Sequence, residues 1–91
     1  MKINDLLDYN YISIHTKSYT QYWSSPKQIE DEGTIFRLAE LNVIFKSQIM
    51  EITLVDDSNP ECNNFLNKRN NTKVLITLKN GEQIKLSIAD K

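Results

Sequence analysis

"KVLITLKNGEQIKLSI", residues 73–88, holds two runs of alternating apolar residues that flank an Asn-Gly pair. Alternation with a period of two is typical of a β-strand with one buried face, and Asn-Gly between two such runs indicates a hairpin. A two-residue turn would place the two apolar sets on opposite faces of this hairpin. A three-residue loop over 79–81, with Gly81 in the left-handed region, places them on one face and is therefore the predicted loop. The predicted cross-strand pairs are Ile76 with Ile84 and Val74 with Leu86.

The segment upstream of this hairpin, residues 33–57, is rich in apolar residues but ambiguous in its spacing. Several of these residues recur at helical intervals, whereas the ends of the segment are rich in Ile, Thr and Val, which favour strands. We therefore predict strands at about 34–40 and 49–55, and leave 41–48 open between helix and strand.

Three short helical turns are predicted outside these strands. The first rests on an apolar stripe near the N-terminus, the second on a Ser-Pro start with a Gly stop, and the third on an Asn-Pro start. Without the third turn, residues 56–72 would form an unusually long loop. The stripe is Ile3, Leu6 and Leu7; the second turn runs from Ser25 and Pro26 through Gln28 to Gly33; the third begins at Asn59 and Pro60.

The composition is that of an ordinary globular chain. Of the 91 residues, 40% are hydrophobic and 25% are charged, and a chain of this length buries enough surface for one modest core. We therefore predict a single α+β domain over residues 1–91, with an antiparallel sheet of four to six strands, short helices and the C-terminal β-hairpin.

Charge and hydropathy restrict where the chain acts. A net charge of −1 argues against a partner that is mainly nucleic-acid phosphate, since that role needs a basic surplus. No apolar run exceeds three residues, far below the roughly 20 needed to cross a bilayer, and the N-terminus lacks the apolar core of a signal peptide. The lone cysteine, Cys62, cannot form an internal disulfide, which agrees with a reducing compartment. We therefore expect a cytoplasmic protein that has no membrane partner.

Side chains suited to catalysis or metal binding are scarce. His15 is the only histidine and Cys62 the only cysteine, whereas a catalytic Cys-His pair needs hydrogen-bond contact and an orienting third group. The carboxylates at 30–32 and 56–57 lack the alternating spacing of a calcium loop, and two glycines are too few for a phosphate-binding loop. We therefore predict that the protein is not an enzyme and holds no metal or cofactor.

The N-terminal stretch 9–23 contains all four tyrosines and the single tryptophan. In a strand over 9–16, Ile12 and Ile14 are the better core candidates, so the tyrosines and His15 on the other face are expected to point outward. Tyr and Trp are enriched at binding hot spots, which makes this a predicted partner-binding surface; core packing of the same rings remains the alternative. The residues of the predicted surface are Tyr9, Tyr11, Tyr19, Tyr22 and Trp23.

Codon bias and the scarcity of catalytic groups indicate an origin and a role. Ile, Lys and Asn fill 30 of the 91 positions, whereas Ala, Gly, Pro and Arg fill eight. These two sets have AT-rich and GC-rich codons respectively, so we expect the gene to come from an AT-rich bacterium or one of its mobile elements. We predict a small non-catalytic inhibitor of phage or mobile-element origin that occludes a larger bacterial protein stoichiometrically. A toxin-neutralising immunity protein would share these features.

A resemblance supports the same class. In size, acidity and composition the chain is similar to small accessory proteins of phages and mobile elements, and its start, "MKINDLL", resembles the start of some anti-CRISPR proteins that block Cas9. The matching residues are Ile3, Asn4, Asp5 and Leu6. The resemblance implies occlusion of a nuclease's nucleic-acid site, but the chain lacks the dense acidic surface of a DNA mimic.

Two other functions stay open. In a nucleic-acid module, bases would stack on the N-terminal rings while a basic loop holds phosphate, although the chain is acidic overall. In a self-assembling protein, the C-terminal hairpin would offer an edge strand for a homodimer, although its lysines oppose such pairing. The basic-loop residues are Lys68, Arg69 and Lys73, and the opposing lysines are Lys79, Lys85 and Lys91.

Overall fold

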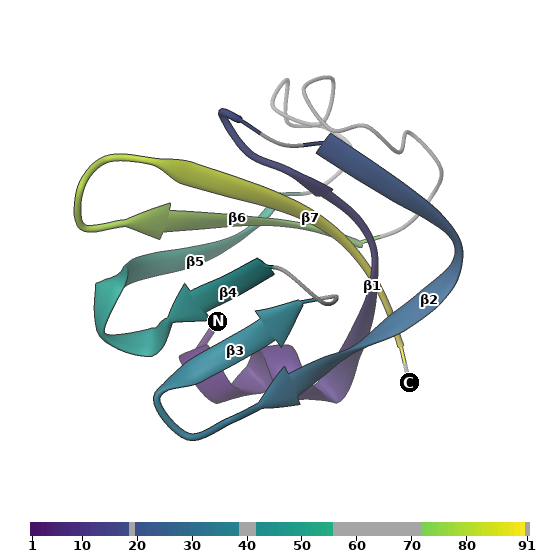
Figure 1. Cartoon of the computed structure of the whole chain (residues 1–91), viewed down its shortest axis with the longest axis horizontal. Helices are drawn as coiled ribbons and strands as arrows, with labels where there is room; N and C mark the ends of the chain where they lie inside the picture. The colour runs from purple at the N-terminus through teal and green to yellow at the C-terminus, as the bar shows by residue number, and fades with distance from the viewer. Residues whose placement is uncertain (19, 39–41, 56–71, 91) are drawn as a thin grey trace.

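The computed structural model describes residues 1–18, 20–38, 42–55 and 72–90 (Figure 1). This part of the chain contains two short 3₁₀ helices and seven strands. In chain order they are η1 (Ile3–Asp8), β1 (Tyr9–His15), β2 (Thr20–Asp31), β3 (Ile35–Leu38), β4 (Asn42–Phe45), η2 (Lys46–Gln48), β5 (Ile49–Val55), β6 (Thr72–Leu78) and β7 (Gln83–Asp90).

The seven strands form one antiparallel sheet in the order β4-β3-β2-β1-β7-β6-β5. The sheet curls into a half-barrel, and 69% of the structure is strand. The predicted α+β class with short helices is therefore wrong, because the fold is mostly β with almost no helix. A curled sheet buries its concave face against itself, so it does not need helices to cover that face.

The C-terminal hairpin has the predicted register. Ile76 pairs with Ile84 and Val74 with Leu86, and all four side chains lie in the core. Gly81 closes the three-residue loop in the left-handed region with φ 91°. The apolar alternation specifies this register, because a slip of one residue would turn one strand's apolar set away from the core.

The hairpin lies inside the sheet rather than at its margin. β7 pairs with β1 and β6 pairs with β5, in addition to their pairing with each other. Both hairpin strands are therefore paired on both sides, and the predicted free edge at this hairpin is wrong. The sheet ends at β4 and β5 instead.

The predicted helical turn at 25–33 is also wrong, because these residues form the second half of β2 and the turn after it. Pairing with β1 on one side and β3 on the other overrides the local capping signals. Pro26 lies between Tyr22 and Lys27, where the register with β1 shifts, so its missing N–H interrupts no regular ladder. Gly33 ends the strand in a tight turn with φ 91°.

The other predicted elements agree more closely with the structure. The N-terminal apolar stripe forms η1, in which Leu6 is buried. The strand expected at 34–40 is β3, and the strand expected at 49–55 is β5 with the same bounds. The open segment 41–48 contains β4 and η2. The third helical turn, at Asn59 and Pro60, lies outside the described residues.

The core lies inside the curled sheet (Figure 1). β2 joins the two sides of the half-barrel, because its residues 20–22 and 27–28 pair with β1 and its residues 29–31 pair with β3. Apolar side chains from β3 and β4 thereby meet those from β1, β5, β6 and β7. The buried members are Leu6, Tyr11, Ile14, Ile29, Phe36, Leu38, Ile44, Ile49, Ile52, Val74, Ile76, Ile84, Leu86 and Ile88.

Candidate functional site

The N-terminal aromatic residues do not form the surface that the sequence predicted. Tyr11 is completely buried, and its ring meets the ring of Trp23 edge-on, with centroids 5.1 Å apart and planes at 86°. Trp23 and Tyr9 are partly buried and pack against the core. The structure therefore shows these rings packed in or against the core, which is the alternative that the sequence left open.

A register shift explains why Tyr11 faces inward. Tyr11 pairs with Ile88 and Ile14 pairs with Leu86, both in the core, and the register changes between these two pairs. Ile12 is the extra residue of this bulge and is only half-buried. An extra residue puts Tyr11 and Ile14 on the same face, whereas regular alternation would have separated them. The predicted outward orientation of Tyr11 and Tyr9 is therefore wrong.

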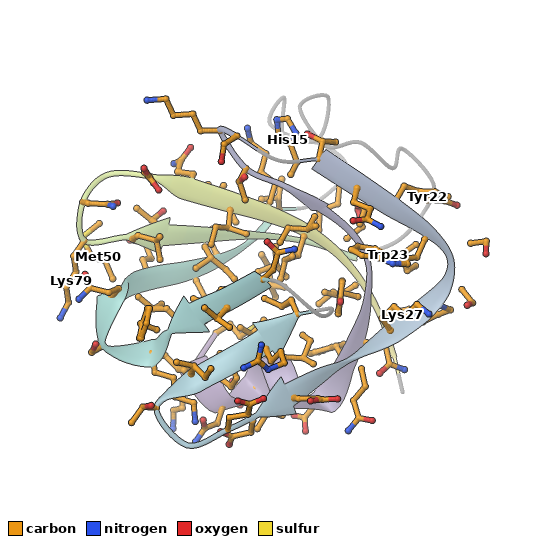
Figure 2. All side chains as sticks on the ribbon, in the orientation of Figure 1. His15, Tyr22, Trp23, Lys27, Met50 and Lys79 are labelled. Atoms are coloured by element: carbon orange, nitrogen blue, oxygen red, sulfur yellow. The ribbon has the colours of Figure 1, made fainter. Side chains whose placement is uncertain are left out.

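Tyr22 is the described member of the predicted surface that is exposed, at 43%. Figure 2 shows it on the outer side of β2, whereas Trp23 lies on the side toward β1. Tyr19 lies outside the described residues. The five predicted residues thus do not form one surface among the described residues.

His15 lies beside a polar cleft at one end of the sheet. Its Nδ1 is 2.6 Å from Thr20 Oγ1 on β2. The cleft, of about 510 Å³, lies between the turn after β1 and the β6–β7 loop, and its lining includes His15, Lys17, Glu82 and Lys85. Cys62 lies outside the described residues.

The basic residues of the nucleic-acid alternative are not brought together on the described surface. Lys73 is buried in β6, where it pairs with Val55 on one side and with Ser87 on the other. A buried ammonium does not reach the phosphates of a nucleic acid. Lys68 and Arg69 lie outside the described residues.

A different set of side chains forms the strongest candidate for a binding surface. Five large hydrophobic side chains of the described residues are exposed, and four of them lie on β4 and β5, the strands that end the sheet. We name these four the edge patch. They are Val43 (40% exposed), Phe45 (56%), Met50 (61%) and Leu54 (54%).

The sequence contained a partial signal for this patch. Val43 and Phe45 flank Ile44 in a run of three apolar residues, and strand alternation predicts opposite faces for Ile44 and its two neighbours. In the structure Ile44 is buried and the other two are exposed. Met50 is exposed at the point where the register between β5 and β6 shifts, and Figure 2 places it beside Lys79.

Leu54 is exposed for a different reason. It pairs with Val74 and therefore shares the core-facing side of the sheet with that residue. Val74 is fully buried, whereas Leu54 on the last strand is more than half exposed. The core-facing side of β5 is therefore not fully covered at Leu54.

A groove of about 590 Å³ lies next to this patch, between the N-terminal residues and β5. Met1, Ile3, Met50 and Ile52 supply apolar parts of its lining. The Met1 ammonium donates a hydrogen bond to the Ile52 carbonyl at 3.4 Å, so part of the outer edge of β5 already has a partner within the chain.

Two ion pairs lie around the β2–β3 turn and the end of β4. Lys46, just after β4, donates to Asp31 at 2.6 Å and lies 4.8 Å from the centre of the Phe36 ring. This hydrogen bond, with a second one from the Gly33 N–H, holds the pKa of the Asp31 carboxyl below its ordinary value. The pair ties the end of β2 to the residue that follows Phe45.

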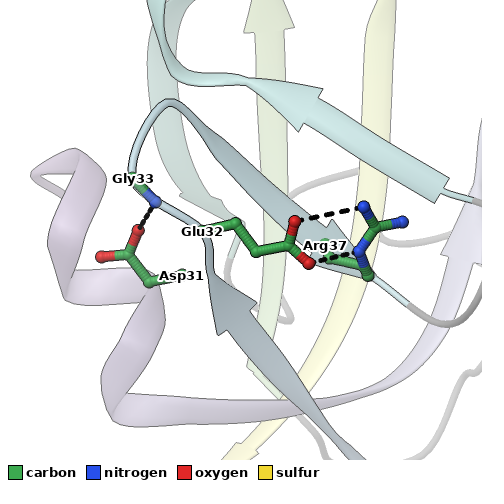
Figure 3. Close-up of polar contacts among 4 residues, drawn as sticks. All are labelled: Asp31, Glu32, Gly33 and Arg37. Carbon is green, nitrogen blue, oxygen red and sulfur yellow. Dashed lines mark hydrogen bonds and ion pairs between the residues drawn. The ribbon is translucent and has the colours of Figure 1, made fainter.

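The second ion pair joins Glu32 to Arg37 across the β2–β3 turn (Figure 3). Arg37 donates from Nε and, at 3.1 Å, from its terminal nitrogen, which makes the contact bidentate. The guanidinium lowers the pKa of Glu32, and the carboxylate raises the pKa of Arg37. Together with Asp31, these residues make a charged clamp at the turn.

The described acidic residues do not assemble into a metal centre. Within the described ranges, no three His, Cys, Asp or Glu side chains come close enough together to hold a metal ion. Asp31 and Glu32 have cationic side chains as their partners.

Comparison with known proteins does not place the chain in a family. No protein-family model, curated protein or solved structure gives a significant match. In the described segments, no helix combines the length and the apolar character that a membrane crossing requires.

Proposed function

We propose that the protein acts without catalysis, by binding a larger protein through the edge patch and covering that protein's working surface. The proposal rests on the exposure of Val43, Phe45, Met50 and Leu54 on the two strands that end the sheet. Four of the five exposed large hydrophobic side chains of the described residues lie on these two strands, and a concentration of exposed apolar side chains is typical of an interaction site. Phe45 is the proposed anchor, because buried aromatic rings carry much of the energy of protein interfaces.

The partner we propose is a larger bacterial protein in the cytoplasm, such as a nuclease or another defence effector, and the origin we propose is a phage or mobile element. The scarcity of catalytic side chains, the single cysteine and the abundance of residues that have AT-rich codons support this role. The resemblance of residues 3–6 to the start of anti-CRISPR proteins makes Cas9 the first target to assay. These residues begin η1, beside the groove at β5.

The test is to capture the partner from lysate of the native host and to rebuild the complex from purified proteins. We expect a one-to-one complex in which the partner's activity is lost. The double variant Val43→Thr with Phe45→Ala should weaken the affinity at least about tenfold, because it removes two exposed apolar contacts and keeps the backbone.

Tyr22→Ala is the matched control, since it removes an exposed aromatic ring from another strand. It should bind with wild-type affinity. If the edge-patch variant binds as tightly as the wild type, or if Tyr22→Ala weakens binding as much, the proposed site is wrong.

A further inference from the structure

The two strands that end the sheet differ in how their outer edges are covered. On β5, the Met1 ammonium donates a hydrogen bond to the Ile52 carbonyl, and Glu51 places a charge on the strand. β4 has neither device: its residues, Asn42–Phe45, carry no charge, and among the described strands only β3 pairs with it. Natural edge strands are usually protected by charge, proline or cover.

The hydrogen bonds to β3 show which backbone groups of β4 point outward. The Lys46 N–H donates to the Thr34 carbonyl at 3.0 Å, and Ile44 lies two residues earlier in the same register. Alternate residues of an antiparallel strand face the same neighbour. The backbone N–H and carbonyl of Ile44 therefore face β3. The outer edge is formed by the N–H groups of Val43 and Phe45 and by the Val43 carbonyl.

We propose that β4 pairs antiparallel with β4 of a second copy of this chain, forming a two-fold symmetric dimer. In the register that places Ile44 opposite the Ile44 of the copy, Val43 lies opposite Phe45 of the copy. Each Phe45 N–H then meets a Val43 carbonyl, and apolar residues face each other on both sides of the ladder. The two-fold axis repeats every contact, so the surface is self-complementary.

Two observations favour a second copy as the occupant. The strand has no charge that would meet its own copy in this register, and the net charge of −1 gives little repulsion between whole chains.

This dimer does not depend on the proposed function, because it uses the backbone edge of β4 whereas partner binding uses exposed side chains. Val43 and Phe45 side chains of both copies would lie on one outer face. The dimer would thereby join the Val43 and Phe45 side chains of two edge patches into a larger apolar surface.

The first test is sedimentation velocity of the whole chain from about 1 to 100 μM. We expect a monomer–dimer equilibrium in the wild type.

Two variants of Phe45 test the backbone contact. Phe45→Pro and Phe45→Ala both lose the ring, but only Phe45→Pro loses the outward N–H. The φ of Phe45 is −72°, close to the value of about −65° that proline requires. Because each dimer would lose two hydrogen bonds, Phe45→Pro should raise the dissociation constant about thirtyfold above that of Phe45→Ala. A monomeric wild type, or equal constants for the two variants, would overturn the proposal.

The second test needs no variant. Amide hydrogen exchange of the wild type should slow at Phe45 as the concentration rises through the dimer transition. The Lys46 amide is the internal reference, since it is already bonded within the chain. A dimer that leaves exchange at Phe45 unchanged would use another surface and would contradict the proposal.

Discussion

β7 pairs with β6 on one side and with β1 on the other, and the two ladders are built differently. The β6–β7 ladder runs from Thr72 opposite Ile88 to Thr77 opposite Gln83 without interruption. The β1–β7 ladder changes register after Tyr11. In the regular ladder every second residue faces the core, whereas the bulge turns two residues of β1 inward that simple alternation would separate.

The difference shows what the bulge achieves. It brings Tyr11 to the inner face, where the partly buried Trp23 ring packs edge-on against it. Trp23 belongs to the part of β2 that has no regular partner in β1. The gathering of amphipathic aromatics near the N-terminus therefore serves packing at an irregular part of the sheet, and large rings fill a space that a regular ladder would not leave.

The largest effect should come from removing the ring that the bulge buries. Tyr11→Ala should lower the free energy of unfolding by about 4 kcal/mol, since it leaves a large cavity in the core. Tyr22→Ala, at an exposed ring in the neighbouring strand, should cost less than about 0.5 kcal/mol. Urea unfolding of both variants checks this pair. Equal losses would mean that the burial assigned to Tyr11 is wrong.

The next prediction compares two isoleucines of β1 that alternation treats as equivalent. Ile14→Ala should cost about 3 kcal/mol, because Ile14 is buried in the core. Ile12→Ala should cost only about 1 kcal/mol, because the bulge leaves Ile12 half-buried. The two urea midpoints should therefore differ clearly. Equal costs at the two positions would mean that β1 has the regular ladder instead of the bulge.

A smaller effect is expected in the regular ladder. A Cβ at Gly81 would meet no atom within 4 Å, so the cost of a side chain there is conformational and not steric. Gly81→Val should lose about 2 kcal/mol, because a β-branched residue resists positive φ. Gly81→Asn, which tolerates this region better, should lose less than about 1 kcal/mol. Thermal melting of the two variants checks the order; an unchanged melting temperature for Gly81→Val would contradict the left-handed loop.

The smallest effect concerns the charged clamp, which lies outside both ladders. The pKa values of Asp31 and Glu32 are lowered in the folded protein. The two carboxylates therefore stabilise the fold at pH values above their pKa values in the unfolded chain. This stabilisation is lost as the pH falls through their pKa values in the folded protein. Stability should therefore drop below about pH 4. The variant Asp31→Asn with Glu32→Gln should show a smaller drop in urea titrations between neutral and acidic pH. An identical pH dependence would show that the ion pairs contribute nothing.

Parts of the fold followed from local pattern alone. The hairpin could be predicted because its strands alternate regularly and its loop has a glycine where the backbone requires positive φ. β5 was predictable from its composition and η1 from its apolar stripe. The helical turn at 25–33 was wrong although its capping residues are correct for a helix, because pairing with two neighbouring strands outweighed them.

The candidate site was less predictable than the fold. Nothing local in "NVIF" shows that β4 ends the sheet, and alternation separates Phe45 from Ile44 without showing which of the two faces is exposed. The predicted aromatic surface was wrong in its orientation at Tyr11 because a bulge is a property of two paired strands. Neither the edge position of β4 nor the bulge in β1 is visible in the spacing of residues along a single strand.

The sequence by itself determined the chemical inventory of the protein and the register of its C-terminal hairpin, since both depend on residues close together in the chain. Only the tertiary structure decided that the seven strands curl into a half-barrel, that Tyr11 faces the core and that β4 and β5 are left at the edges. These features depend on pairing between distant segments, and the free energy of burying their apolar faces exceeds the weak local preferences that a sequence displays.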